Sequence, residues 1–200
     1  KPYLRTVAQP KWTPAPGGGP EGSILTLSTS ADVIDNAAIH GPAVVAMPDG
    51  SFGMLYGAQG TGEFYDIASS PDDIGALGGA VSTDGIVWSK SYGPMLGGAV
   101  EFGVAQFPPF TPEWQLYSVV DPAIERVGTV FHVWASGFGY ENVWRIGRFS
   151  GTDLFDLGPH VDGDFDTGEV LGPGPSGNFD DAGALQPSLL LEASGGHRVF

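Results

Sequence analysis

Short apolar runs alternate with polar turn sequences from Ser23 to the end of the chain. Each run has about five to nine residues and is rich in β-branched and aromatic side chains, as strands are. The runs are SILTLSTS, AVVAM, SFGMLYGA, FYDIASS, QLYSVV, TVFHVWASG, VWRIGRFS and SLLLEA. The sequences PDG, TDG, SGTD, DGD and SGG between them are typical of turns. Because no helical apolar stripe runs free of Gly and Pro, the pattern predicts an all-β fold.

Three segments of the chain share one pattern. GPAVVAMPDGSFGMLYGAQG begins at Gly41, DPAIERVGTVFHVWASGFG at Asp121 and QPSLLLEASGGHRVF at Gln186. Each has a residue before proline, a short apolar strand, a turn with glycine, and a second strand beginning near an aromatic residue. FYDIASS at 64–70 and VWRIGRFS at 143–150 supply a third strand after the first two copies. Four-stranded antiparallel units repeated in this way predict a β-propeller, with about three blades in this chain.

The turn STDGIVW at 82–88 is the most specific local motif. We predict that Ser82 and Asp84 bind turn amides, that Gly85 takes a positive φ, and that Trp88 folds back onto the sheet. A ligand role for Asp84 is the alternative.

Composition divides the chain into two parts. Residues 1–22 carry five prolines and a GGG run, which favours an extended N-terminal arm, and residues 23–200 form the incomplete propeller domain. The chain has 8 Lys+Arg against 23 Asp+Glu and a net charge of −15, which argues against nucleic acid as a partner. It has no cysteine and no apolar run long enough to span a membrane. An acidic, lysine-poor chain that does not begin with Met fits an exported protein, secreted or at the cell surface.

The repeat, the STDGIVW turn and the NFDDAGALQPSLLL sequence at 178–191 resemble the five-bladed propeller glycosidases. That group comprises arabinanases, β-xylosidases, invertases, levansucrases and related phosphorylases. FDDAGALQPSLL is similar to the run with which their blades often open. The resemblance covers roughly residues 24–200 and implies five blades in the whole. Another chain or a missing C-terminal segment is therefore expected to complete the propeller.

The resemblance also implies carboxylates around the central axis, because glycoside cleavage needs two carboxyl groups in opposite protonation states. The family commonly places axial aspartates in an Asp-Pro dipeptide, and Asp121 matches this position. Gly41 and Gln186 occupy it in the other copies, and neither transfers a proton. Asp121 is accordingly either an axial carboxylate or a strand-start residue bound to backbone. No motif marks a general acid, and Glu101, in the irregular GGAVEFG stretch, is our candidate.

Three further residues are candidates for binding sugar. His40 precedes the proline of the first copy and is a candidate for the site. The resemblance leaves the position expected for a general base vacant, and Asp32, Asp35 or His40 is the substitute if the register differs. Tyr140 and Trp144 lie beside glycines and Glu141, where aromatic faces stack on sugar rings or fill the wedge between blades.

The acidic run at 160–169 is a candidate metal loop. Asp162, Asp164 and Asp166 alternate, and oxygen ligands at that spacing suit Ca²⁺. The run departs from the EF-hand, with Thr167 where Gly is required and Pro173 where Glu is required. A solvated acidic loop is the alternative to a Ca²⁺ site.

Two function classes follow. The first is a carbohydrate-directed secreted protein, either a glycoside hydrolase with paired carboxylates or a binder of poly- or oligosaccharide. The second is a non-catalytic propeller that serves binding or structural assembly, which the residues Gly41 and Gln186 favour.

Overall fold

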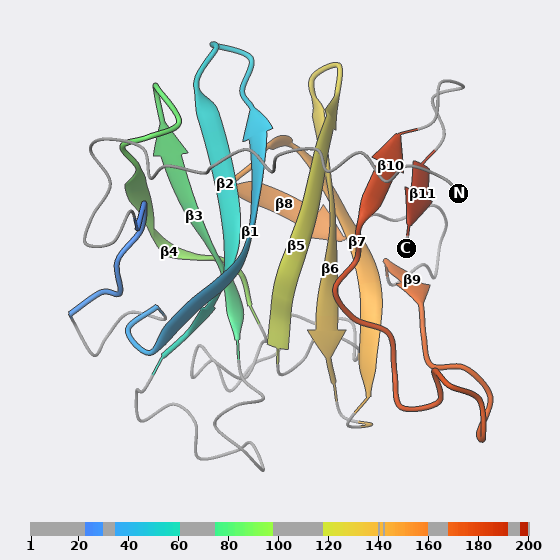
Figure 1. Ribbon diagram of the computed structural model, residues 1–200. Coiled ribbons are helices and arrows are strands. Elements are labelled where there is room, and N and C mark those ends of the chain that lie inside the picture. The colour runs from blue at the N-terminus through green and yellow to red at the C-terminus, as the bar shows by residue number, and fades with distance from the viewer. Residues whose placement is uncertain are drawn as a thin grey trace, which may run out of the picture.

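The computed structural model describes residues 23–29, 35–60, 75–97, 118–139, 141, 143–159, 168–191 and 197–199. All the regular secondary structure in these ranges is strand, as predicted, and the strands form antiparallel sheets (Figure 1). These ranges contain no helix long and apolar enough to cross a membrane. The predicted arm at 1–22 lies outside them.

The described residues form a four-stranded blade, a five-stranded blade and part of a third unit. The first blade has the strand order β1-β2-β3-β4. Its strands are β1 Ala38–Ala46, β2 Phe52–Gln59, β3 Ala76–Ser82 and β4 Ser89–Gly97. The second blade has the order β5-β6-β7-β8, and β9 also pairs with β7. Its strands are β5 Ser118–Val127, β6 Val130–Phe138, β7 Trp144–Asp153, β8 Asp156–Pro159 and β9 Glu169–Leu171.

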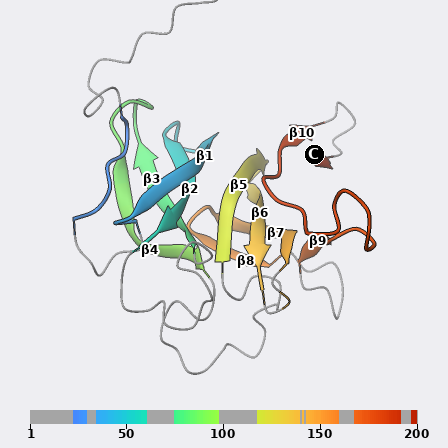
Figure 2. The same cartoon turned by 60° about the horizontal axis from the view of Figure 1, so that its bottom comes forward.

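The third unit contributes β10 Leu189–Leu191 and β11 His197–Val199, which pair antiparallel. In both cartoon views β1, β5 and β10 follow one another across the molecule, each the first strand of its unit (Figures 1 and 2). This arrangement confirms the predicted propeller-blade architecture for the part of the chain that the structure describes.

The main core lies between the two complete blades. Leu55 and Leu77 from the first blade pack with a larger set from the second, all of them buried: Val119, Phe131, Val133, Ala135, Phe149, Leu154 and Leu157. Phe131, Val133 and Ala135 alternate along β6, so one face of this strand supplies the contact. The opposite face of the first blade buries Met54, Tyr56, Ala58 and Ala80, and Leu25 and Trp88 pack against them.

The third strand of the first blade differs from the sequence prediction. We expected it at 64–70, a segment outside the described residues; the structure has it at β3, whose sequence is ALGGAVS. Glycine weakens an isolated strand, so the pattern did not mark this one. Here Gly78 is required, because a Cβ at this position would lie 2.5 Å from the Tyr56 ring. The predicted strand at 23–30 is also wrong, since residues 23–29 contain no strand.

The turn at 82–88 is the hairpin that the sequence predicts. The Asp84 carboxylate accepts hydrogen bonds from the amides of Val87 and Ile86 at 2.9 and 2.8 Å. The Ser82 hydroxyl accepts from the Gly85 amide at 2.9 Å, and the Trp88 indole donates to the Gly85 carbonyl at 3.1 Å. The two amide bonds, followed by the Ser82 hydroxyl, lower the pKa of the Asp84 carboxyl. The residues of this turn are engaged in holding the hairpin.

Candidate functional site

Each copy of the repeat holds the residue before its proline in a left-handed conformation. The φ values are +53° at Gly41, +52° at Asp121 and +59° at Gln186. Asp121 and Gln186 are the two non-glycine residues with positive φ in the described ranges. In β1 and β5 this residue lies in a bulge, at the register shifts between His40 and Ala43 and between Val120 and Ala123. A bulge of this kind re-aims a side chain at the sheet edge.

Each later unit also meets the preceding blade in the same way, two residues before its residue of positive φ. The Val119 amide donates to the Gly75 carbonyl at 3.0 Å, two residues before Asp121. The Ala184 amide donates to the Trp144 carbonyl at 2.9 Å, two residues before Gln186. Gly75 immediately precedes β3 and Trp144 begins β7, the third strand of each blade. The alignment of the three copies in the sequence therefore corresponds to equivalent positions in space.

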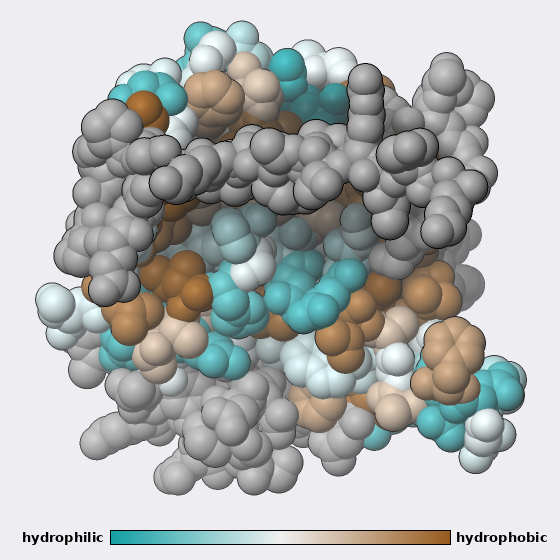
Figure 3. All heavy atoms as spheres, in the orientation of Figure 1, coloured by the Kyte–Doolittle hydropathy of each residue, from teal (hydrophilic) through white to brown (hydrophobic). Residues whose placement is uncertain are grey.

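His40 and Asp121 meet across the two blades. His40 Nδ1 lies 3.2 Å from Asp121 Oδ1. Since an ionised carboxylate only accepts hydrogen bonds, we assign the Nδ1 proton to His40, which leaves Nε2 as an acceptor in the neutral ring. The side chains are 37% and 18% exposed respectively, so both are accessible. The space-filling view shows hydrophilic residues gathered in a recessed part of the surface over the middle of β1 and β5 (Figure 3).

Two glycines make room for this pair. A Cβ at Gly41 would lie 2.7 Å from Asp121 Oδ1, and a Cβ at Gly57 would lie 2.6 Å from His40 Cε1. The Asp121 carboxylate thus lies over Gly41 and the imidazole lies against Gly57, its cross-strand neighbour in β2. Contacts this short do not occur with a real Cβ, so any larger residue at either position would displace its neighbour.

Gln186 enters the same region from the third unit. Gln186 is exposed, and its backbone amide donates a hydrogen bond of 2.8 Å to the Ser136 hydroxyl. Ser136 is fully buried and pairs with Val120, the residue before Asp121. The buried hydroxyl therefore fixes the Gln186 backbone beside the bulge that carries Asp121.

The turn before Gln186 is closed by its own backbone. The Gly183 amide donates to the Asp180 carbonyl at 3.2 Å, and the Gly177 amide donates to the Asp181 carboxylate at 2.8 Å. A Cβ at Gly174 would lie 2.0 Å from Asp180 Oδ1. Asp180 and Asp181 therefore belong to a turn, and both take part in hydrogen bonds within it.

The remaining predicted site residues are distributed as follows. Trp144 packs against Phe138, with ring centroids 5.0 Å apart. Its backbone carbonyl accepts the hydrogen bond from Ala184 of the third unit. Glu101, Tyr140, Asp162, Asp164 and Asp166 lie outside the described residues. Within the described ranges, no group of three or more His, Asp or Glu side chains is placed to hold a metal ion. Contact of Asp121, His40 and Trp144 with a ligand stays a prediction.

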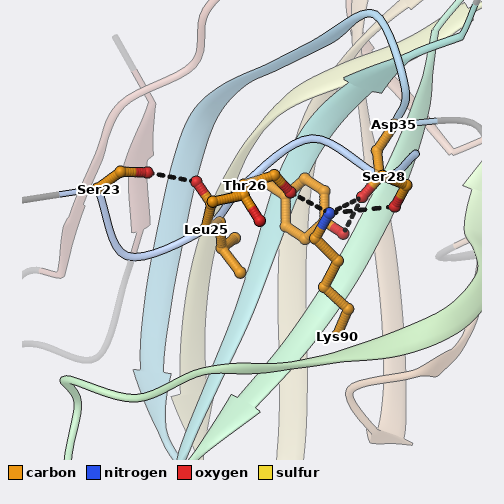
Figure 4. A network of polar contacts seen from close by, with 7 residues as sticks. Ser23, Leu25, Thr26, Ser28, Asp35 and Lys90 are labelled. Carbon is orange, nitrogen blue, oxygen red and sulfur yellow. Dashed lines mark hydrogen bonds and ion pairs between the residues drawn. The ribbon is translucent and has the colours of Figure 1, made fainter. Parts of the chain in front are cut away.

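Asp35, the other acidic residue upstream of His40, has a different role. It is 4% exposed and forms an ion pair with Lys90, with Nζ 2.6 Å from Oδ2 (Figure 4). The Tyr56 hydroxyl donates to the same oxygen at 3.2 Å, and Lys90 also binds the carbonyl of Thr26 and the hydroxyl of Ser28. This network holds the segment 23–29 on the first blade.

The charges of this network shift the pKa values of its members. Burial alone raises the pKa of Asp35, but hydrogen bonds from Lys90 and Ser28 and the Lys90 charge outweigh burial and bring it below its usual value. Burial and the neighbouring Asp35 charge raise the pKa of Tyr56. Asp35 is thus an ionised structural carboxylate that pairs with Lys90.

A polar cluster on the second blade is also distinct from the site. His132 Nδ1 accepts a hydrogen bond from Arg148 at 3.0 Å, and the Arg148 guanidinium lies 5.1 Å from the centre of the Trp134 ring. Trp134 is buried. The cation–π contact and the hydrogen bond give His132, Arg148 and Trp134 a structural role on the second blade.

Comparison with known proteins identifies similar folds at low sequence identity. No family model and no curated protein matches the sequence. A structure from the GH130 family of mannoside phosphorylases, described as containing glycoside hydrolases that target β-1,2-mannosidic linkages in Candida mannan, is similar with a TM-score of 0.61 and 16% identity. The match covers 90% of this chain and 48% of that one.

Two further structures are similar. A glycosyl hydrolase from Bacteroides ovatus has a TM-score of 0.56 and 18% identity over 78% of this chain and 38% of its own. An arabinanase from Bacillus subtilis has a TM-score of 0.50 and 16% identity over 82% and 48%. This chain therefore spans less than half the length of these structures. Its fold is that of part of a propeller similar to those of glycoside hydrolases and mannoside phosphorylases.

Proposed function

We propose that this chain is the carbohydrate-facing part of a propeller and that His40 and Asp121 contact the hydroxyl groups of a sugar. The observation that carries the proposal is the partly exposed His40–Asp121 pair on β1 and β5, the first strands of two adjacent blades. Similarity to propellers that act on glycans supports the choice of ligand. A carboxylate and the free acceptor of an imidazole are suitable partners for a sugar hydroxyl, because both accept its proton in a hydrogen bond.

A glycoside hydrolase is the catalytic form of this proposal. In that form Asp121 is an axial carboxylate and a second carboxyl group, Glu101 in our prediction, completes the pair that glycoside cleavage requires. The geometry within the described residues supplies one carboxylate at the three equivalent positions 41, 121 and 186. In the His40–Asp121 hydrogen bond, His40 is placed as a base and Asp121 as the group that orients it. This arrangement suits proton transfer to or from a bound hydroxyl.

A non-catalytic carbohydrate-binding propeller is the second candidate. A specific observation favours it: Gly41 leaves the first axial position without a side chain, and the Asp121 carboxylate fills the space above it. Gln186 provides an amide at the third. Such an axis offers hydrogen bonds for recognition and a single titratable carboxylate among the three equivalent positions.

The test measures binding and hydrolysis separately. Binding of neutral arabino-, manno-, xylo- and fructo-oligosaccharides is measured by calorimetry, and cleavage is measured with aryl-glycosides of the same sugars, with Asp121→Asn and His40→Ala as variants. Binding that both variants weaken supports the proposal, and cleavage abolished in Asp121→Asn selects the hydrolase. A wild-type protein that binds none of these sugars overturns the proposal.

A further inference from the structure

Position 186 combines an unusual backbone conformation with an exposed polar side chain. Gln186 has φ +59°, and the residue after it is proline. Left-handed conformations are uncommon for non-glycine residues, and the residue before a proline is normally extended. Asp and Asn tolerate the left-handed region better than most residues because their short side chains bond locally, an advantage that the longer Gln lacks.

The fold itself accepts glycine at this position. Gly41 occupies the equivalent place in the first copy, with φ +53° and the same following proline. Glycine reaches this conformation without the steric cost that a side chain brings. A non-glycine residue held there is a reason to look for a function, because local backbone strain is found where the side chain is needed.

The repeat indicates where the Gln186 side chain belongs. Asp121 meets the preceding blade through the Val119–Gly75 hydrogen bond and lies over Gly41. Gln186 meets its preceding blade through the equivalent Ala184–Trp144 hydrogen bond. The Ser136 hydroxyl, next to Val120, accepts a hydrogen bond from the Gln186 backbone amide. The position of Gln186 relative to Asp121 therefore repeats that of Asp121 relative to Gly41.

We propose that Gln186 is a specificity-determining residue of the axial site. The site binds a neutral polyhydroxylated ligand between the Gln186 side-chain amide and the His40–Asp121 pair. The inference rests on the proposed function and extends it to the class of sugar. The amide offers both donors and an acceptor to hydroxyl groups and carries no charge. A carboxylate there would stand near Asp121 in a chain with a net charge of −15, and an anionic sugar would meet the same repulsion.

Binding measurements test the ligand part of this proposal. The probes are β-1,2-mannobiose and 1,5-α-L-arabinotriose as neutral sugars and trigalacturonate as an anionic one. We expect Gln186→Ala and Gln186→Gly to weaken neutral-sugar binding about tenfold, the loss of one or two hydrogen bonds, and Gln186→Asn to weaken it less. We expect trigalacturonate to bind more weakly than the neutral sugars. Gln186→Ala with unchanged binding, while His40→Ala loses it, overturns the inference and leaves the proposed function in place.

Stability measurements test it independently of any sugar. Glycine relieves the left-handed conformation at 186, so Gln186→Gly is expected to keep or raise the urea midpoint of unfolding. The matched control is Ser188→Gly, two residues further on, which is exposed and has no positive φ, and it is expected to lower the midpoint slightly. A Gln186→Gly variant less stable than Ser188→Gly would show that the side chain serves the fold, and would overturn the inference. If the wild type binds no sugar, the proposed function fails and the inference about Gln186 fails with it.

Discussion

The Asp121 carboxylate occupies the space above Gly41, where the Cβ of any other residue would lie 2.7 Å from its Oδ1 atom. Gly41 and Asp121, which are equivalent positions of the repeat, are therefore in direct contact in the site. The glycine that breaks the Asp-Pro pattern in the first blade is what allows the aspartate of the second blade to reach His40.

Gly41→Ala is expected to displace Asp121 from His40 and to weaken sugar binding. Any non-glycine residue at φ +53° also costs about 1–2 kcal/mol in backbone strain. The matched control is Gly128→Ala, at φ +63° with no atom near the new Cβ, which carries the backbone cost alone. Urea unfolding and calorimetric titration of both variants separate the two effects. Equal losses of stability and unchanged binding in both variants would contradict the contact with Asp121.

Gly57→Ala is expected to push the His40 ring away from its place against β2, because the new Cβ would lie 2.6 Å from the ring. Sugar binding should fall in this variant, and Gly57→Ala should have no further effect on binding in a His40→Ala background. The double-mutant cycle measured by calorimetry gives this coupling. Additive losses of binding would show that Gly57 acts on something other than His40.

Lys90→Met is expected to destabilise the protein, because it leaves the buried Asp35 carboxylate without its cation. Breaking a buried ion pair by removing one partner typically costs about 3–5 kcal/mol, and the partial exposure of Lys90 places the expected loss at the lower end. The control is Lys90→Met combined with Asp35→Asn, which removes the orphaned charge and should recover part of the stability. Urea unfolding measures all three. A single variant as stable as the wild type would contradict the assigned role of the pair.

Acid is expected to remove the stability that Asp35 contributes. Because its pKa in the folded protein is lower than the ordinary 3.8, the folded state favours the ionised form. That contribution is complete above pH 3.8 and is lost as the pH falls through the lower folded value. The difference in unfolding free energy between wild type and Asp35→Asn, followed from neutral pH to pH 3, should shrink towards the acid end. A constant difference over this range would contradict the assignment.

Asp84→Ala is expected to destabilise the first blade without affecting sugar binding. The carboxylate accepts hydrogen bonds from two turn amides, and their loss removes part of the support of the hairpin at 82–88. Thermal unfolding and sugar titration of the same variant check the two halves of this expectation. A loss of binding with unchanged stability would restore the ligand role for Asp84 that the sequence left as an alternative.

Much of the fold could be predicted from local signals. The alternation of strands and turns, the three copies at 41, 121 and 186, and the STDGIVW hairpin depend on neighbouring residues, and the structure confirms them. Strand β3 could not be predicted, because its glycines are tolerated through contacts such as that of Gly78 with Tyr56, which are made between strands. Local β-propensity at 23–30 was likewise misleading, since the structure holds residues 23–29 without strand pairing, through Lys90.

The candidate site could be predicted in part. The proline pattern marked Asp121 and His40 separately, but their contact joins residues 81 positions apart and no local signal connects them. The role of Gly57 was missed for the same reason, because a glycine within a strand looks the same whether or not a side chain from the neighbouring strand lies over it. Alignment of the copies gave one usable signal for the site. It places His40 immediately before Gly41 and Val120 immediately before Asp121, which are equivalent positions of the repeat.

The most direct test is to map sugar binding onto the protein by NMR, with the full chain labelled with ¹⁵N and ¹³C and titrated with the neutral oligosaccharides named above. The account predicts chemical-shift changes at the His40 ring, the Asp121 amide and the Gln186 side-chain amide, with little change at Gly128 and Asp84, which lie in hairpin turns. Shift changes that avoid His40 and Asp121, or none with any of these sugars, would contradict it.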